Sequence, residues 1–178
     1  SIVPVDFAGL PVDLEAFRAL ANKHDLWIIE DACHAPGGYF TDSKNLKQNC
    51  GNGNYADIGI FSFHPVKHIA CGEGGMITTN SEILYKKLAS LRSHGITKEH
   101  MAENHGGWFY EMQELGFNYR LTDIQSALGV TQLAKNNLGV ARRNIIAKTY
   151  KDAFQGIIKF QNLQEGVLNA HHLFVIEV

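Results

Sequence analysis

The chain has 178 residues, of which 45% are hydrophobic and 19% are charged, and its formal net charge is −2. This composition is too apolar for a disordered segment, and the near-neutral charge argues against nucleic acid or an anionic membrane as a partner. The sequence has no bilayer-spanning run and no signal segment at its start, so we expect a cytoplasmic protein.

The first part of the chain follows the order strand, helix, strand. Residues 2–6 are apolar and β-branched, residues 13–24 carry apolar side chains at helical spacing behind Asp13 as N-cap, and residues 26–29 are a continuous apolar run. This order predicts a βαβ crossover. Residues 41–54 are polar and rich in Asn, Lys and Gly, which predicts a surface loop.

The rest of the chain continues the alternation. Residues 57–63 and 76–79 are predicted strands, and Ser81 is expected to cap a helix that reaches about residue 91. Residues 94–114 show no clear period. Helical spacing returns over residues 122–151, with a break expected near residues 136–139.

Both ends of the chain lie in apolar, strand-like segments. The last of these covers residues 174–178. We therefore expect the chain to be the middle part of a larger α/β protein, truncated at both ends.

Two strand ends carry residues suited to chemistry. Asp31 directly follows an apolar run, where it could orient a cationic ring nitrogen or simply cap a turn. Lys67 follows the next predicted strand, and an apolar setting would lower its pKa and favour a Schiff base with an aldehyde cofactor. The alternative is an ordinary surface lysine. Ser62, at the end of the same strand, could donate a hydrogen bond to a phosphate.

Metal and disulfide chemistry are less well supported. His64 and His68 have a spacing of four, but Pro65 opposes a helix there, and the sequence has no H-E-x-x-H motif. The three cysteines include no C-x-x-C pair, which favours reduced thiols. We predict no metal site.

Five motifs in order make a more specific pattern. The motifs are EDACHA at 30–35, SFHPVK at 62–67, GEGG at 72–75, LRSHG at 91–95 and GFNYRLTDIQSA at 116–127. With these motifs in this order, the chain resembles the DegT/DnrJ/EryC1/StrS family of pyridoxal-phosphate-dependent nucleotide-sugar aminotransferases, from about residue 3 to its end.

The resemblance implies a role for each matching residue. Lys67 corresponds to the catalytic lysine that bonds to pyridoxal 5'-phosphate, and Asp31 to the carboxylate that keeps the pyridine nitrogen protonated. His34 corresponds to a residue beside the cofactor's 3-hydroxyl, and Ser62 to a hydroxyl that binds the phosphate. Asn118 corresponds to a residue that reaches the cofactor phosphate of the neighbouring subunit, which implies a homodimer.

The resemblance also implies the fold. It predicts part of the large domain of the aspartate aminotransferase (type I) fold, an α/β domain with a mixed, mostly parallel sheet and flanking helices. Residues 1–150 would belong to this cofactor-binding domain, and residues 151–178 would begin the C-terminal small domain. The family's phosphate-binding turn has no equivalent in this chain. We therefore expect the isolated chain to bind the cofactor weakly and to turn over slowly.

Residues 107–120 refine the expected substrate. Their sequence, GWFYEMQELGFNYR, is most similar to the aminotransferases of pseudaminic acid synthesis. These transfer an amino group from glutamate to C4 of a UDP-linked 4-keto-6-deoxy-N-acetylhexosamine. The alternatives are a perosamine-type enzyme acting on a GDP-linked 4-keto sugar and a non-catalytic fragment of the fold.

Overall fold

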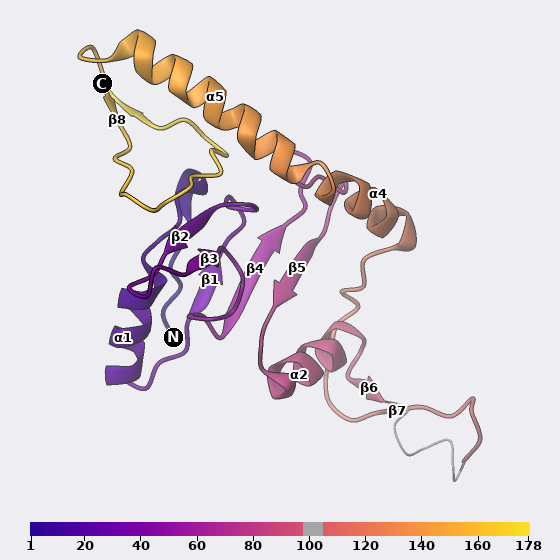
Figure 1. The fold of residues 1–178 in the computed structure, drawn as a ribbon. Helices are drawn as coiled ribbons and strands as arrows, with labels where there is room; N and C mark the ends of the chain where they lie inside the picture. Colours follow the sequence, from indigo (N-terminus) through magenta and orange to yellow (C-terminus); the bar gives the residue numbers. More distant parts are fainter. Residues whose placement is uncertain (98–104) are drawn as a thin grey trace. The chain divides into compact units, whose positions relative to one another are not determined.

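The computed structural model describes residues 1–97 and 105–178 of the chain (Figure 1). The chain divides into two compact units. The first consists of residues 1–80 and 123–178, and the second of residues 81–122. The first unit contains the main sheet and four of the five predicted site residues.

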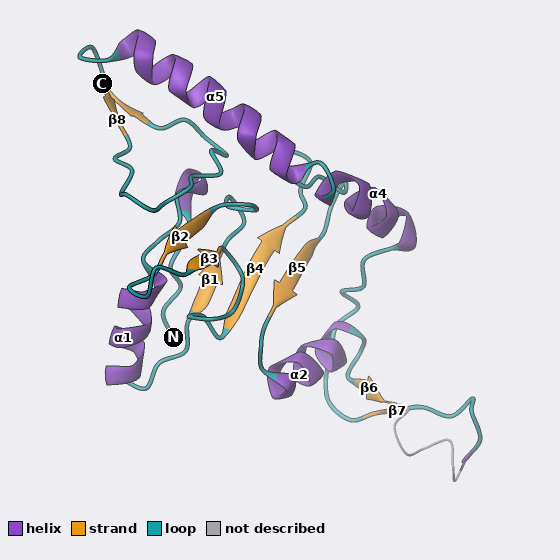
Figure 2. Ribbon diagram, in the orientation of Figure 1, coloured by secondary structure: helices purple, strands orange, loops and turns teal. Residues whose placement is uncertain are grey.

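A three-stranded sheet lies in the first unit (Figure 2). Its order is β1 (Ile29–Asp31), β4 (Ile58–Ser62) and β5 (Gly75–Thr78). Strands β1 and β4 are parallel with Asp31 opposite Ile60, whereas β4 and β5 are antiparallel. The sheet is therefore mixed and partly parallel, and the predicted strands at 57–63 and 76–79 are confirmed.

The predicted βαβ order is also present. Ile2 and Val5 form isolated parallel bridges to the β1 segment rather than a full strand. Between them and β1 lies helix α1 (Leu14–Lys23), whose N-cap Asp13 accepts a hydrogen bond from the Ala16 N–H at 3.0 Å. The helix begins where the capping residue predicts, because this bond satisfies one of the otherwise unpaired N–H groups of the first turn.

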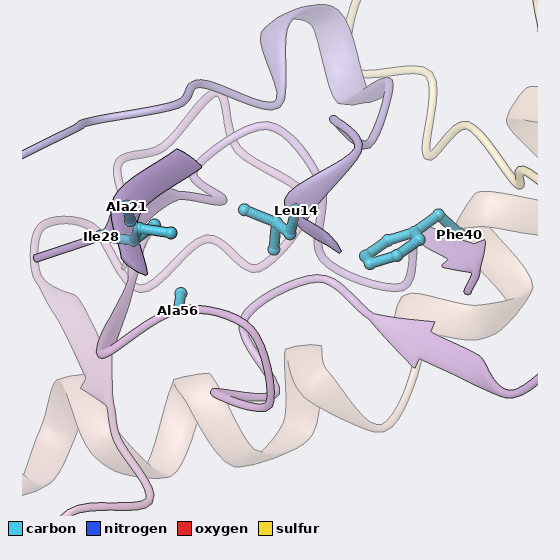
Figure 3. Packing of buried hydrophobic residues seen from close by; sticks show 5 residues of the cluster. All are labelled: Leu14, Ala21, Ile28, Phe40 and Ala56. Carbon is cyan, nitrogen blue, oxygen red and sulfur yellow. The ribbon is translucent and has the colours of Figure 1, made fainter. Parts of the chain in front are cut away.

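The largest buried hydrophobic cluster joins α1 to the sheet and to a hairpin (Figure 3). Leu14 and Ile28 are 3% and 0% exposed, and each such side chain contributes roughly 1.5–3 kcal/mol by its burial. The five members of this cluster come from widely separated segments of the sequence: Leu14, Ala21, Ile28, Phe40 and Ala56.

Strand β1 begins later than the apolar run predicts. Leu26 and Trp27 are 36% and 56% exposed, and β1 starts only at Ile29. The Leu26 N–H donates to the Ala21 carbonyl at 2.9 Å, so this residue closes the end of α1 instead of joining the sheet. An apolar run alone does not predict that the Leu26 N–H bonds to the helix instead of to a neighbouring strand.

The prediction of a surface loop over residues 41–54 was wrong. Strands β2 (Tyr39–Thr41) and β3 (Lys47–Asn49) form an antiparallel hairpin in this region. Two of its polar side chains, Asp42 and Gln48, are buried because they bind each other, whereas most of the others are exposed. The Asp42 carboxylate accepts hydrogen bonds from the Leu46 N–H at 2.8 Å and the Gln48 amide at 2.7 Å.

Two consecutive helices and a short strand pair complete the first unit. Helices α4 (Asp123–Leu133) and α5 (Asn136–Phe154) are separated at residues 134–135, slightly before the predicted break. The short strands β8 (Lys159–Phe160) and β9 (Ile176–Glu177) pair in antiparallel fashion. The predicted domain boundary after residue 150 falls inside α5 and stays a prediction.

The second unit contains helix α2 (Glu82–Arg92) and the short antiparallel strands β6 (Ile96–Thr97) and β7 (Glu111–Met112). Ser81 caps α2 as predicted, since its side chain accepts a hydrogen bond from the Leu84 N–H at 3.3 Å. Part of the predicted irregular segment, residues 98–104, lies outside the described residues. Within the described ranges, none of the helices combines the length and apolar character needed to cross a membrane.

Candidate active site

The parallel pairing of β1 and β4 brings two predicted site residues to one edge of the sheet, and a third follows β4 in the chain. Asp31 is the last residue of β1, Ser62 is the last residue of β4, and Lys67 follows five residues later. The carboxyl ends of neighbouring parallel strands are the edge at which α/β folds bind ligands. The spacing of these residues in the sequence is therefore consistent with one site.

Asp31 is held firmly by its own backbone. Its N–H donates to the Pro4 carbonyl at 2.9 Å, and its carbonyl accepts from the Asp6 N–H at 3.0 Å. Its carboxylate oxygen Oδ1 accepts a hydrogen bond from the Cys33 N–H at 3.0 Å. The two interpretations of Asp31 are thus compatible, since the carboxylate closes a turn with one oxygen at a ligand-binding edge.

Lys67 lies in a tight turn after β4. Its N–H donates to the His64 carbonyl at 2.9 Å, and the Ser62 hydroxyl accepts from the His64 N–H at 3.3 Å. Lys67 is half-buried, and its charge helps to lower the pKa of His34. A half-buried ammonium close to a predicted site residue differs from an ordinary surface lysine.

Cys33 is an inert neighbour of this group. Burial, reinforced by the hydrogen bond and the charge of Asp31, raises the pKa of the Cys33 thiol to about 12. The thiol is therefore neutral at physiological pH and is not a nucleophile.

His34 lies in a cluster of histidine rings. Its ring stacks on His172, with centroids 4.4 Å apart and planes at 28°, and the ring of His68 lies 5.5 Å from that of His172. The Ala8 N–H donates to His34 Nδ1 at 3.3 Å, so the neutral ring carries its proton on Nε2. The His34 Nε2–H is therefore a hydrogen-bond donor, as an oxygen atom of the cofactor would require.

The histidines of the cluster are held in their neutral form. Burial lowers the pKa of His34, and the positive charge of Lys67 lowers it further. Burial also lowers the pKa of His172 to about 4 and that of His68 below its ordinary value. The rings of His34, His68 and His172 therefore add no positive charge to the predicted site at neutral pH.

His172 is a residue that the sequence analysis missed. It is held in place by the Ala170 N–H, which donates to the Gly9 carbonyl at 2.8 Å, and by Arg143, whose Nη1 donates to the His171 carbonyl at 3.0 Å. A side chain at Gly9 would place its Cβ 2.7 Å from the His171 nitrogen. The doublet of histidines before an apolar run was the available signal.

The predicted residue Asn118 lies in the second unit. Its side chain is exposed, and its backbone forms an antiparallel bridge with Ser93. Its role towards a neighbouring subunit stays a prediction.

The two histidines considered as metal ligands do not form such a site in the described residues. His64 Nε2 lies 4.0 Å from the Glu73 carboxylate on the surface. Within the described part of the chain, one group has the spacing of metal ligands, and it contains neither histidine.

Comparison with known proteins identifies the chain's relatives. The family model described as DegT/DnrJ/EryC1/StrS aminotransferase family matches residues 1–178. The chain belongs to this family. The resemblance that the five motifs indicate is therefore confirmed.

Individual relatives agree with this assignment. The chain is 40% identical over 178 residues to a UDP-4-amino-4,6-dideoxy-N-acetyl-beta-L-altrosamine transaminase of Campylobacter jejuni, covering 99% of this chain and 44% of that protein. The solved structure of Helicobacter pylori PseC, described as an aminotransferase involved in the biosynthesis of pseudoaminic acid, matches with a TM-score of 0.83 and 35% identity. That match covers 98% of this chain and 44% of the PseC chain.

A third match is a putative sugar aminotransferase from Streptococcus pneumoniae in its PMP form, with a TM-score of 0.86 and 29% identity over 99% of this chain and 49% of that one. The predicted fold class, part of the type I aminotransferase fold, is confirmed by these neighbours. The chain spans about half the length of the relatives it matches.

Proposed function

We propose that this chain carries part of the active site of a pyridoxal-phosphate-dependent sugar aminotransferase. The observation that carries the proposal is that the parallel strands β1 and β4 end at one edge of the sheet. Asp31 and Ser62 are their last residues, and Lys67 lies in the turn after β4. The chain belongs to a family of aminotransferases, and its relatives include a nucleotide-sugar transaminase and structures solved in PLP and PMP forms.

The residues at this edge fit pyridoxal phosphate chemically. They offer a carboxylate for the pyridinium nitrogen, a primary amine for the aldehyde carbon, and a hydroxyl for the phosphate. His34 adds an Nε2–H for the ring oxygen, because its Nδ1 already accepts a hydrogen bond from the Ala8 N–H. Cys33, whose raised pKa keeps it neutral, adds no competing charge.

Each residue has a distinct task in this proposal. The bound cofactor supplies an electron sink that stabilises negative charge on a substrate carbon. Asp31 keeps the ring nitrogen protonated, because an adjacent carboxylate favours a cation. Lys67 would hold the cofactor through its amine, and as a free amine it would move a proton at the reacting carbon.

We propose glutamate as the amino donor and a UDP-linked 4-keto-6-deoxy-N-acetylhexosamine as the acceptor. Residues 107–120 resemble the enzymes that use this acceptor, and the names of the Campylobacter and Helicobacter relatives support it. A GDP-linked 4-keto sugar is the alternative acceptor. The two are distinguished in single-turnover reactions with the chain in excess over each sugar, because slow turnover is expected.

We also propose that the protein acts as a homodimer in the cytoplasm. Asn118 is exposed, as a residue that serves a neighbouring subunit must be in a single chain. Helix α4 exposes large apolar side chains, with Ile124 86% exposed and Val130 70% exposed. Such surfaces are typical of interfaces, and sedimentation of a stable monomer at high concentration would contradict the proposal.

Covalent trapping tests the site directly. The purified chain is mixed with excess pyridoxal phosphate, reduced with borohydride and mapped by mass spectrometry. We expect the label at Lys67, its loss in Lys67→Ala, and a reduced yield in Asp31→Ala. Reduction is irreversible, so even weak binding accumulates label.

A matched control is Lys86→Ala, which removes an exposed lysine paired with Glu82 on α2. This variant should label like the unmodified chain. Equal labelling of many lysines, unchanged in Lys67→Ala, would contradict the site assignment.

A further inference from the structure

A second cluster of titratable groups lies next to Asp31 but outside the predicted site. Asp6, Glu30 and Cys50 are 1%, 0% and 8% exposed, and their side-chain oxygen and sulfur atoms lie within 4.8 Å of one another. Glu30 directly precedes Asp31 in β1, and the Asp6 N–H donates to the Asp31 carbonyl at 3.0 Å. The cluster therefore adjoins Asp31 of the predicted site through the backbone.

Each carboxyl group uses one oxygen to hold a backbone segment. Asp6 Oδ1 accepts from the Val12 N–H at 2.9 Å, and Glu30 Oε1 accepts from the Gly51 N–H at 2.8 Å. The other two oxygens, Asp6 Oδ2 and Glu30 Oε2, are buried and find no donor among the described residues. Two ionised carboxylates facing each other without water or a donor would be very costly.

We propose that Asp6 and Glu30 form a buried acid–carboxylate pair that shares one proton and positions Asp31. The shared proton gives the two unpartnered oxygens a hydrogen bond to each other, and it leaves the pair with a single negative charge. The pair then joins three backbone segments, at Val12, at β1 and at Gly51. The positioning role rests on the proposed function, because it concerns the residue assigned to the ring nitrogen.

The electrostatic surroundings agree with this geometry. Burial raises the pKa of Glu30 to about 8, and the charge of Asp6 raises it too. Burial raises the pKa of Asp6 to about 6, although hydrogen bonds, first that from Val12, offset part of the effect. The other titratable groups that face the pair are Asp31, whose charge disfavours a second carboxylate, and the neutral thiol of Cys50.

A divalent cation is the competing explanation for the unpartnered oxygens. Two carboxylates and a thiolate could hold such an ion, but burial and both carboxyl groups raise the pKa of Cys50 well above its ordinary value. A proton satisfies both oxygens while leaving the thiol neutral. A bound cation predicts that a chelator lowers stability, whereas a shared proton predicts no response to a chelator.

The pH dependence of unfolding tests the shared proton. Between pH 6.5 and 8 the folded pair keeps a proton that the unfolded carboxyl groups have lost. Because the folded state binds more protons, stability falls as pH rises, and the unfolding constant should increase by up to about tenfold per pH unit. The buried histidines oppose this slope near pH 6.5 and the thiols add to it near pH 8, so the proton of the pair is measured as the difference in slope between the unmodified chain and the amide variants.

Amide variants should remove this slope. In Glu30→Gln the side chain can still accept from Gly51 and can donate an amide N–H to Asp6, but it cannot titrate. We expect the slope of this variant to differ from that of the unmodified chain by up to about tenfold in the unfolding constant per pH unit. The matched control is Glu165→Gln, which makes the same change at an exposed residue and should keep the full slope.

Asp6→Asn provides a second test if Glu30→Gln does not fold. It should also flatten the slope, and infrared spectra of the unmodified chain at pH 7 should show the carbonyl stretch of a protonated carboxyl group. Glu30→Ala should lower the trapping yield at Lys67, and Glu30→Gln should restore it. Rescue by the amide would show that hydrogen bonding, not charge, positions Asp31.

Several results would overturn the proposal. These are a slope equal in the unmodified chain and both amide variants, an infrared spectrum without a protonated carboxyl group, and a loss of stability on adding EDTA. The pH measurements need no cofactor. Suppose that Lys67 is not labelled by pyridoxal phosphate while the pH dependence of unfolding is as expected. The proposed function then fails, and the shared proton stands.

Discussion

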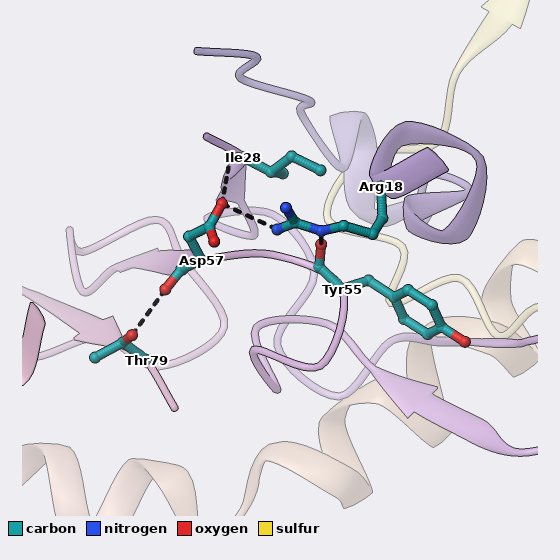
Figure 4. Close-up of polar contacts among 5 residues, drawn as sticks. All are labelled: Arg18, Ile28, Tyr55, Asp57 and Thr79. Atoms are coloured by element: carbon teal, nitrogen blue, oxygen red, sulfur yellow. Dashed lines mark hydrogen bonds and ion pairs between the residues drawn. The ribbon is translucent and has the colours of Figure 1, made fainter. Parts of the chain in front are cut away.

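The two ends of the three-stranded sheet solve the problem of buried polar groups differently. At the end where β1 and β4 begin, Arg18 donates to the Tyr55 carbonyl at 2.8 Å and to the Asp57 carboxylate at 2.9 Å (Figure 4). The same carboxylate accepts from the Ile28 N–H at 2.7 Å. The Asp57 carbonyl accepts from the Thr79 hydroxyl, which ties in the segment after β5.

At the other end, polar atoms are buried without such partners. Within the described ranges these include Asp6 Oδ2, Glu30 Oε2 and the Nδ1 atoms of His68, His171 and His172. Buried polar groups are normally paired, and unpaired ones concentrate where function requires them. The difference is that one end of the sheet is fixed by complete pairing, whereas the other end buries titratable groups beside the proposed site.

The largest effect is expected from a single methyl group at the ligand-binding end. Gly9 has a φ of +98°, and a Cβ there would lie 2.7 Å from the His171 nitrogen and 2.9 Å from the His172 nitrogen. Gly9→Ala should therefore lower the free energy of unfolding by about 3 kcal/mol, combining backbone strain with displacement of the histidine segment. Urea denaturation at pH 7 measures it.

Gly139→Ala is the matched control, because nothing lies within 4 Å of the Cβ it would add inside helix α5. This change should stabilise the chain by up to about 1 kcal/mol through helix propensity. Equal effects of the two substitutions would show that the close approach at Gly9 does not matter.

A smaller effect is expected at the fully paired end. Asp57→Ala removes the hydrogen-bond partner of both the Arg18 guanidinium and the Ile28 N–H. With both side chains of the ion pair about a quarter exposed, at 24% and 26%, the loss should be about 2 kcal/mol.

Asp152→Ala is the control for this prediction, since Asp152 pairs with Lys148 on the exposed face of α5. Its cost in urea denaturation should stay below about 0.5 kcal/mol. A loss at Asp57 no larger than at Asp152 would mean that the network of Figure 4 adds nothing beyond a surface ion pair.

The sequence predicted the parts of this comparison that depend on local signals. Asp31 and Ser62 end the parallel strands β1 and β4, so the rule that parallel strands end at one edge predicted their common position, with Lys67 in the turn that follows. Asp13 and Ser81 predicted their helices because capping is a local interaction.

Interactions between distant segments could not be predicted in this way. In the polar hairpin, Asp42 and Gln48 are buried because their side chains bind each other, whereas composition alone indicates exposure. The ring of His172 stacks on that of His34, although the two residues are more than a hundred positions apart in the sequence. The parallel bridge between Val5 and Asp31 brings Asp6 close to Glu30. No local sequence pattern predicts such contacts.

The smallest effect concerns the histidine cluster and depends on pH. Burial lowers the pKa of His172 to about 4 in the folded chain, so protonation below the ordinary value of 6.5 favours the unfolded state. Its contribution to stability is complete above pH 6.5 and is lost as the pH falls towards 4. His172→Phe keeps an aromatic ring on His34 but cannot bind a proton.

We therefore expect His172→Phe to lose less stability than the unmodified chain between pH 7 and pH 5, by about 1 kcal/mol after allowing for partial exposure. His24→Phe is the control, because His24 is exposed at the end of α1. Comparing each variant with the unmodified chain at both pH values cancels the opposing contribution of Asp6 and Glu30. If both variants respond to pH alike, His172 titrates as a surface histidine, and the contrast between the two ends of the sheet rests on the carboxyl pair alone.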